Sequence, residues 1–157
     1  MTTKTFELNE TLLQNLYKSA SGGDKAILEE KFGKDILCQS IINRTPTVEA
    51  ALAIAGKTIA GLTRSTDSKH ETACRIIEAV IEILNDGEKV DYSNSDQTKY
   101  EPRFYHTPGL GLSCDGYDNW NTGTGCGPRL CYLKYDVMLH GIKILDTYYN
   151  DYLNSKK

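Results

Sequence analysis

The sequence predicts an α+β fold in which helices at both ends of the chain flank a small three-stranded antiparallel sheet. Apolar residues recur at helical spacing before residue 85 and again after residue 136. The stretch 100–135 between them holds three of the four prolines, six of the thirteen glycines, the only tryptophan and three of the five cysteines. Functional residues concentrate on irregular segments held by a rigid scaffold. We therefore expect the sheet, and any functional site, in this stretch.

Length and composition predict one domain, 1–157, with a helical part over 1–62 and a helix–three-strand meander–helix part over 67–155. The net charge of −3 gives no electrostatic reason to bind nucleic acid or an anionic membrane. No apolar run approaches the roughly 18 residues of a membrane span. The first ten residues have no apolar region typical of a secretory signal, and the five cysteines include no CxxC pair. These features predict reduced thiols and a cytoplasmic location.

The N-terminal part reads as short helices separated by breaks. Residues 8–17 have helical spacing with Asn9 as the expected cap, and Asp24 is expected to cap the next helix, which ends at Gly33. The apolar run 36–42 fits either a strand or a buried helical turn. Thr47 is expected to cap a further helix after the break at Pro46.

Gly56, Lys57 and Thr58 resemble the end of a phosphate-binding loop, but the glycine that this motif needs five residues earlier is Ala51. The surrounding sequence is helical rather than a strand followed by a loop. We therefore interpret Gly56 as the end of a helix.

The strongest element is a long core helix over 68–85. Ser68 and Glu71 have the spacing of a capping box, in which each side chain satisfies a free backbone N–H at the helix start. An apolar stripe runs from Ala73 to Leu84, and the sequence Asn85-Asp86-Gly87 ends the helix. This helix should be buried.

Three short strands are expected after the polar turn 90–98, namely Pro102–Thr107, Gly111–Tyr117 and Arg129–Tyr135. A C-terminal helix capped by Asp136 should follow. This helix, the helix over 68–85, or both should cover the apolar face of the sheet, because a small sheet is not stable alone.

The sequence between Tyr92 and Lys134 contains YSNS, KYEPRF, GLGLS, a patch of Tyr, Asp, Asn and Trp, and GPRLCYLK. In these segments the chain resembles a family of small proteins encoded by phages and prophages of gut Bacteroidales. The likeness covers the C-terminal part of the chain, with a looser echo in ETLLQNLYKSA and LEEKFGKDI. Pro128 departs from the small polar residue of the family pattern, so one backbone N–H that a ligand could use is missing. The resemblance implies a helix–sheet–helix fold and a phage-linked context, and it carries over no catalytic residue.

One constellation in this stretch suits a small anionic ligand. Glycine loops let the backbone approach phosphates, arginine and lysine bind them, and aromatic rings stack on bases. The expected ligand-binding residues are Arg103, Tyr105, Tyr117, Trp120, Gly123, Gly125, Arg129, Tyr132 and Lys134. Arg129, which follows the glycine loop, is the expected anion anchor, and Trp120 the expected stacking surface. The alternative is that the aromatics fill the core and the glycines only make turns.

Catalytic and metal sites find less support. Cys114, Cys126, Cys131 and His106 lack the close ligand pairs of zinc modules, and no pattern links His106 to one thiol. We therefore expect no metal, no cofactor and no enzymatic activity.

The expected function is that of a phage accessory protein that binds a small anionic ligand. Its most specific form is sequestration of a cyclic or other signalling nucleotide, by which a phage evades host immunity. The rival function is a protein-interaction module that inhibits a host protein through a tyrosine-rich surface. The oligomeric state is left open, and a homo-oligomer fits either function.

Overall fold

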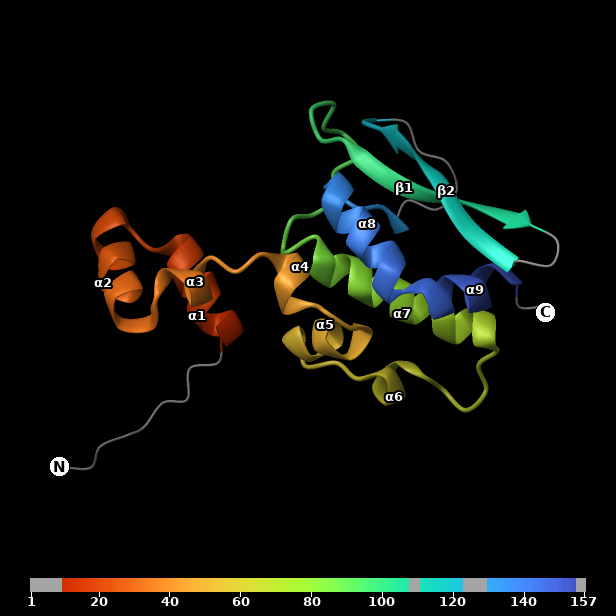
Figure 1. The fold of residues 1–157 in the computed structure, drawn as a ribbon, viewed down its shortest axis with the longest axis horizontal. Coiled ribbons are helices and arrows are strands. Elements are labelled where there is room, and N and C mark those ends of the chain that lie inside the picture. Colours follow the sequence, from red (N-terminus) through yellow and green to blue (C-terminus); the bar gives the residue numbers. More distant parts are fainter. Residues whose placement is uncertain (1–9, 108–110, 123–129, 155–157) are drawn as a thin grey trace. The chain divides into compact units, whose positions relative to one another are not determined.

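The computed structural model describes residues 10–107, 111–122 and 130–154 (Figure 1). Its fold class is α+β, as predicted. The chain divides into two compact units, 1–40 and 41–157. The expected division between residues 62 and 67 falls inside the second unit, and the single-domain organisation stays a prediction.

Within its described residues, 10–40, the first unit contains three helices: α1 (Glu10–Ser19), α2 (Gly22–Phe32) and α3 (Lys34–Leu37). Gln14 Nε2 donates a hydrogen bond to the carbonyl oxygen of Ile36 at 2.8 Å, which links α1 to α3. The hydroxyl of Tyr17 on α1 donates to the carboxylate of Glu29 on α2, and this bond raises the pKa of Tyr17. The expected cap Asn9 lies outside the described residues. Asp24 does not cap α2, because Ser21 holds that position and its hydroxyl donates to the Asp24 carboxylate at 2.6 Å.

The second unit begins with three short helices: α4 (Ile41–Arg44), α5 (Val48–Ile54) and α6 (Ile59–Leu62). The run 36–42 thus forms helical turns and no strand. Thr47 caps α5 as predicted, since its side chain accepts a hydrogen bond from the backbone N–H of Ala50 at 3.2 Å. Gly56 follows the end of α5 with φ +64°, a conformation that glycine adopts without strain. Thr58 then caps α6, so the Gly-Lys-Thr sequence joins two helices.

The long helix α7 (Lys69–Leu84) is the centre of the second unit, and its capping box is present as predicted. Figure 1 shows α7 between α5 and α6 on one side and the two C-terminal helices on the other. Its apolar stripe is buried, with Ile76, Ile77 and Val80 fully enclosed. The core of this unit therefore forms around α7.

The sheet is a two-stranded antiparallel hairpin of β1 (Lys99–Thr107) and β2 (Gly111–Trp120). Arg103 pairs with Gly116 and Phe104 with Cys114, so Asp115 is an extra residue in a β-bulge.

The predicted third strand, Arg129–Tyr135, is wrong over its described part. Only one residue pair forms there, an isolated bridge in which Tyr100 and Tyr132 exchange backbone hydrogen bonds of 2.8 and 2.9 Å. The next bonded pair of an antiparallel ladder would place Leu130 opposite Pro102, and Pro102 has no N–H to donate. In the other direction, Tyr135 already begins a helix.

The predicted C-terminal helix is two helices, α8 (Tyr135–Ile144) and α9 (Asp146–Asn154), separated at Leu145. Lys134 holds the N-cap position of α8, so the expected cap Asp136 lies in the first turn instead. The helices cover one face of the hairpin, as expected, with the rings of Phe104 on β1 and Tyr149 on α9 4.7 Å apart. In the part of the chain that the structure describes, no helix is long and apolar enough to cross a membrane.

Candidate functional site

The predicted ligand residues do not form one cluster in the described part of the chain. Gly123, Gly125 and Arg129 lie outside the described residues. Tyr132 is fully buried, and its hydroxyl is hydrogen-bonded to that of Tyr149 at 3.0 Å. Its burial and the neighbouring Tyr149 raise the pKa of Tyr132 well above its usual value. Tyr132 is thus placed in the core, where its ring offers no surface to a ligand.

Arg103 is an exposed residue of β1 whose charge is already matched by carboxylates. Its guanidinium nitrogens lie 3.7 Å from Asp115 Oδ1 and 3.5 Å from Asp118 Oδ1, both on β2. The guanidinium also lies against Gly116, where an added Cβ would come within 3.0 Å of Nη2. An anion at this position would have to compete with both aspartates, so the surroundings of Arg103 disfavour an anion site.

Trp120 is packed rather than open. The ring of Tyr92 stacks on it at a centroid distance of 5.8 Å and an angle of 15°. The ammonium of Lys99 lies 5.7 Å from the centre of the indole ring. Burial raises the pKa of Glu101 on β1, and a hydrogen bond from the Trp120 indole opposes that shift. Trp120 therefore stabilises the end of the hairpin, and Tyr92 was not predicted as its partner.

Lys99 is a fully buried lysine whose burial no sequence pattern predicted. Its ammonium donates hydrogen bonds to the carbonyl oxygens of Asn94, Gln97 and Asn121 at 3.2, 2.8 and 2.6 Å. Three carbonyl acceptors match the three N–H donors of an ammonium group. Lys99 thus joins the polar turn before β1 to the residue that follows β2.

Lys134 is exposed and lies 3.2 Å from a carboxylate oxygen of Glu88. The two remaining predicted residues, Tyr105 and Tyr117, are exposed aromatic side chains on the hairpin, with accessible fractions of 53% and 40%. The guanidinium carbon of Arg103 lies 5.9 Å from the Tyr105 ring centre. Arg103 and Lys134 are exposed but already paired with carboxylates. The surface that the predicted residues offer to a partner is therefore mainly aromatic.

Tyr117 belongs to a group of three rings that we call the tyrosine cluster: Tyr100, Tyr117 and Tyr135. The ring centres are 5.9 Å apart between Tyr100 and Tyr117, 6.1 Å between Tyr100 and Tyr135, and 4.8 Å between Tyr117 and Tyr135. Tyr135, at the start of α8, is 43% exposed. Tyr100 is partly buried against the core. Sequence reasoning missed Tyr135 as a surface residue, because it was expected inside a strand. The high number of tyrosines, ten in the chain, is the sequence feature that could have predicted an exposed tyrosine cluster.

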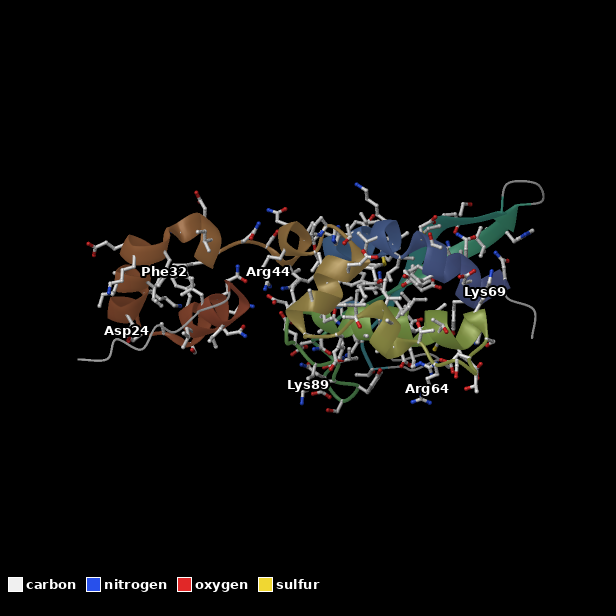
Figure 2. All side chains as sticks on the ribbon, turned by 90° about the horizontal axis from the view of Figure 1, so that it is seen from below. Asp24, Phe32, Arg44, Arg64, Lys69 and Lys89 are labelled. Atoms are coloured by element: carbon white, nitrogen blue, oxygen red, sulfur yellow. The ribbon has the colours of Figure 1, made fainter. Side chains whose placement is uncertain are left out.

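The second unit also has a groove of about 600 Å³ along α7. Its lining includes the apolar residues Leu62, Ala79 and Val90 and the ring of Tyr92. Three basic residues, Lys57, Arg75 and Lys89, and three acidic ones, Glu78, Glu82 and Glu88, also line it. Lys57 lies 3.4 Å from Glu82, and Arg75 is paired with Asp67. Figure 2 shows Lys69 at the beginning of α7 and Lys89 beyond its end.

Of the thiols considered as metal ligands, Cys114 and Cys131 lie within the described residues. Cys131 is buried, and burial raises the pKa of its thiol to about 11, so it stays protonated at neutral pH. Cys114 is partly buried on β2, and Cys126 lies outside the described residues. Within the described ranges, no three His, Cys, Asp or Glu side chains are placed to hold a metal ion.

Comparison of the chain with protein-family models, with curated proteins and with solved structures finds no match. The resemblance to phage proteins, the absence of catalysis and the predicted partners therefore stay predictions.

Proposed function

We propose that this chain is a non-catalytic interaction module that binds a protein partner through the tyrosine cluster. The observation that supports this function is three mutually contacting tyrosine rings, two of which are about two-fifths exposed. Tyrosine supplies a large rigid contact area with a polar end, and it is enriched among the residues that contribute most to protein interfaces. In a phage-linked context, the partner would be a host protein that the chain inhibits.

The experiment is capture of host proteins by the tagged chain from a gut Bacteroidales lysate, compared between matched variants. The double variant Tyr117→Ala, Tyr135→Ala removes the two exposed rings of the cluster. The matched control is Tyr105→Ala, which removes a more exposed tyrosine of the same hairpin that has no ring contact with the cluster.

We expect one protein to be captured by the wild type and by Tyr105→Ala, and lost with the double variant. Melting temperatures should show that all variants fold. Capture that is equal for the wild type and the double variant, or no specific capture at all, would contradict the proposal.

The second candidate function is binding of a small anionic ligand, such as a signalling nucleotide. The groove along α7 favours it, because its volume lies within the usual range for ligand sites and Lys89 makes no ion pair among the described residues. The three glutamates of the groove oppose it. The glycine loop with Arg129 is the other place where such an anion could bind.

Thermal shift with cyclic mono- and dinucleotides tests this candidate, since a ligand that binds only the folded state raises the melting temperature. Binding that is lost with Lys89→Ala but kept with Arg129→Ala would place the ligand in the groove, and the reverse would place it at the glycine loop. Arg103→Ala is the control, because Arg103 is already paired with two aspartates. No shift with any nucleotide would argue against this function.

A further inference from the structure

The outer edge of β2 indicates the conformation and the residue types of the segment that the chain binds. A hairpin of two strands has two edges, and an edge strand presents unpaired N–H and C=O groups to which another strand can bind. On the β1 side, Tyr100 is already paired with Tyr132, and Pro102 lacks an N–H. On the β2 side, none of the backbone–backbone hydrogen bonds of the described residues involves 111–120 except the pairing with β1.

The direction of the β2 backbone groups follows from the Tyr100–Tyr132 bridge. In an antiparallel ladder the N–H and C=O of one residue point to the same side, and successive residues alternate. Because Tyr100 directs both groups to Tyr132, it is not hydrogen-bonded to its β2 neighbour, Asn119. Asn119 therefore points its N–H and C=O away from β1. The same holds two residues away for Tyr117, which lies opposite Pro102.

Side chains next to this edge differ on the two faces of the hairpin. On the face covered by helices lies Tyr117, in contact with Tyr135 of α8. On the other face, Asp115 and Asp118 share the single guanidinium of Arg103. Both aspartates are substantially exposed, and Glu101 is paired opposite Asp118. This face therefore has an excess of negative charge at the edge.

We propose that β2 binds an extended peptide segment as an additional β-strand, and that this segment alternates apolar with basic residues. Its backbone pairs with Tyr117 and Asn119, its apolar side chains pack on the tyrosine cluster, and its basic side chains lie beside Asp115 and Asp118. Backbone pairing supplies affinity and alternating side chains supply specificity in this mode of recognition. A second copy of β2 fits less well, because two such strands would place the aspartates of both copies on one face, where like charges repel.

This inference rests on the proposed function, since the tyrosine cluster forms one side of the same site. The test uses two variants of one residue. Asn119→Pro removes the outward N–H without removing a bond to β1, and Asn119→Ala keeps that N–H. The probes are a short fluorescein-labelled peptide of alternating valine and lysine and its counterpart of alternating valine and glutamate, each measured by fluorescence anisotropy.

We expect the valine–lysine peptide to bind the wild type and Asn119→Ala with dissociation constants within about twofold, and Asn119→Pro at least about tenfold more weakly. The valine–glutamate peptide should bind the wild type at least about tenfold more weakly than its counterpart. No binding of the valine–lysine peptide, or equal binding by the two Asn119 variants, would overturn the inference.

Amide hydrogen exchange gives a second measurement that does not depend on a variant. The amide of Asn119 should exchange rapidly in the free protein and slowly with the valine–lysine peptide bound. The amide of Asp118, whose pairing is with Glu101, should be slow in both. Slow exchange at Asn119 in the free protein would overturn the inference, because the edge would then already be paired, by another segment or by a second copy.

The capture experiment separates the two proposals. A partner that is lost with Tyr117→Ala, Tyr135→Ala but captured equally by Asn119→Pro and Asn119→Ala would retain the interaction function and reject strand addition. A partner whose capture does not depend on the tyrosines would reject the interaction function through this cluster.

Discussion

Replacing Gly141 on α8 by alanine should destabilise the protein, although the same change in an open helix is stabilising. A Cβ at this position would lie 2.4 Å from the hydroxyl oxygen of Tyr132, 2.5 Å from its Cε1 and 2.7 Å from its Cζ. Ordinary contacts between such atoms are about 3.5–4.0 Å, so the ring would have to move by about 1 Å. Tyr132 has no free space for that movement, since it is fully buried and hydrogen-bonded to Tyr149.

The expected size of the effect follows from two opposing contributions. Overpacking of a core costs about 1–3 kcal/mol, and alanine gains about 1 kcal/mol over glycine inside a helix. We expect a net loss of up to about 2 kcal/mol in the free energy of unfolding, or a melting temperature lowered by up to about 8 °C. Thermal and urea unfolding followed by circular dichroism measure it.

A double-mutant cycle shows whether the contact is the cause. In the background Tyr132→Leu, which is itself destabilised by the lost ring, Gly141→Ala should cost much less or become stabilising. If Gly141→Ala raises the melting temperature of the wild type, or costs the same in both backgrounds, the close packing of α8 on Tyr132 is refuted.

Three further predictions concern the core and the loops. Ile77→Ala should lower the free energy of unfolding by about 2–4 kcal/mol in urea titrations, because the side chain is fully buried, whereas a loss below about 0.5 kcal/mol would show it to be exposed. Lys99→Met should lower it by about 1.5–3 kcal/mol, since three carbonyl groups lose a charged donor, and equal urea midpoints would contradict that reasoning. Hydrogen bonds from the Ser68 side chain and backbone lower the pKa of Glu71, so its contribution to stability is present above about pH 5 and is lost as the pH falls through the lowered folded pKa. The melting temperature should therefore fall more steeply from pH 6 to pH 3 in the wild type than in Glu71→Gln, and parallel curves would argue against this role.

Sequence reasoning succeeded where a local pattern decides the structure. The capping box of Ser68 and Glu71, the Thr47 cap and the apolar stripe of α7 all depend on residues a few positions apart, so periodicity and capping chemistry suffice. Leu145, in contrast, separates α8 from α9 with neither Pro nor Gly to signal the break.

The third strand was mispredicted because strand propensity says nothing about the partner's hydrogen-bonding groups. Its residues alternate in the expected way, but the pairing stops where Pro102 cannot donate. Leu133 N–H and the carbonyl of Cys131, which point away from β1, are hydrogen-bonded to the side chain of Asn85, at 3.0 and 3.2 Å. That contact joins residues 46 to 48 positions apart, which no local pattern can reveal.

The candidate site was harder to predict than the fold. Whether a side chain is free to bind a ligand depends on which residues lie next to it on the neighbouring strand. Arg103 was expected to bind an anion, but the register of the hairpin sets it beside Asp115 and Asp118. Trp120 was expected to be an open stacking surface, but Tyr92, twenty-eight positions earlier by number, covers it. Arg103, Tyr105, Tyr117 and Trp120 could thus be assigned to the hairpin, while their availability to a ligand could not be predicted.

The extra residue of the β-bulge, Asp115, shifts by one position the numbering of the β2 side chains that lie on the helix-covered face of the hairpin. Before Asp115, even-numbered side chains such as Cys114, opposite Phe104, lie on the helix-covered face; after it, the odd-numbered Tyr117 does. Deleting Asp115 would make the pairs Phe104–Cys114 and Arg103–Gly116 successive in a regular ladder, and Tyr117 would stay on the helix-covered face. Because side chains in a strand alternate, a one-residue gap between Tyr117 and Trp120 would instead turn Trp120 toward that face. Homologues should therefore tolerate the loss of Asp115 better than a gap after Tyr117.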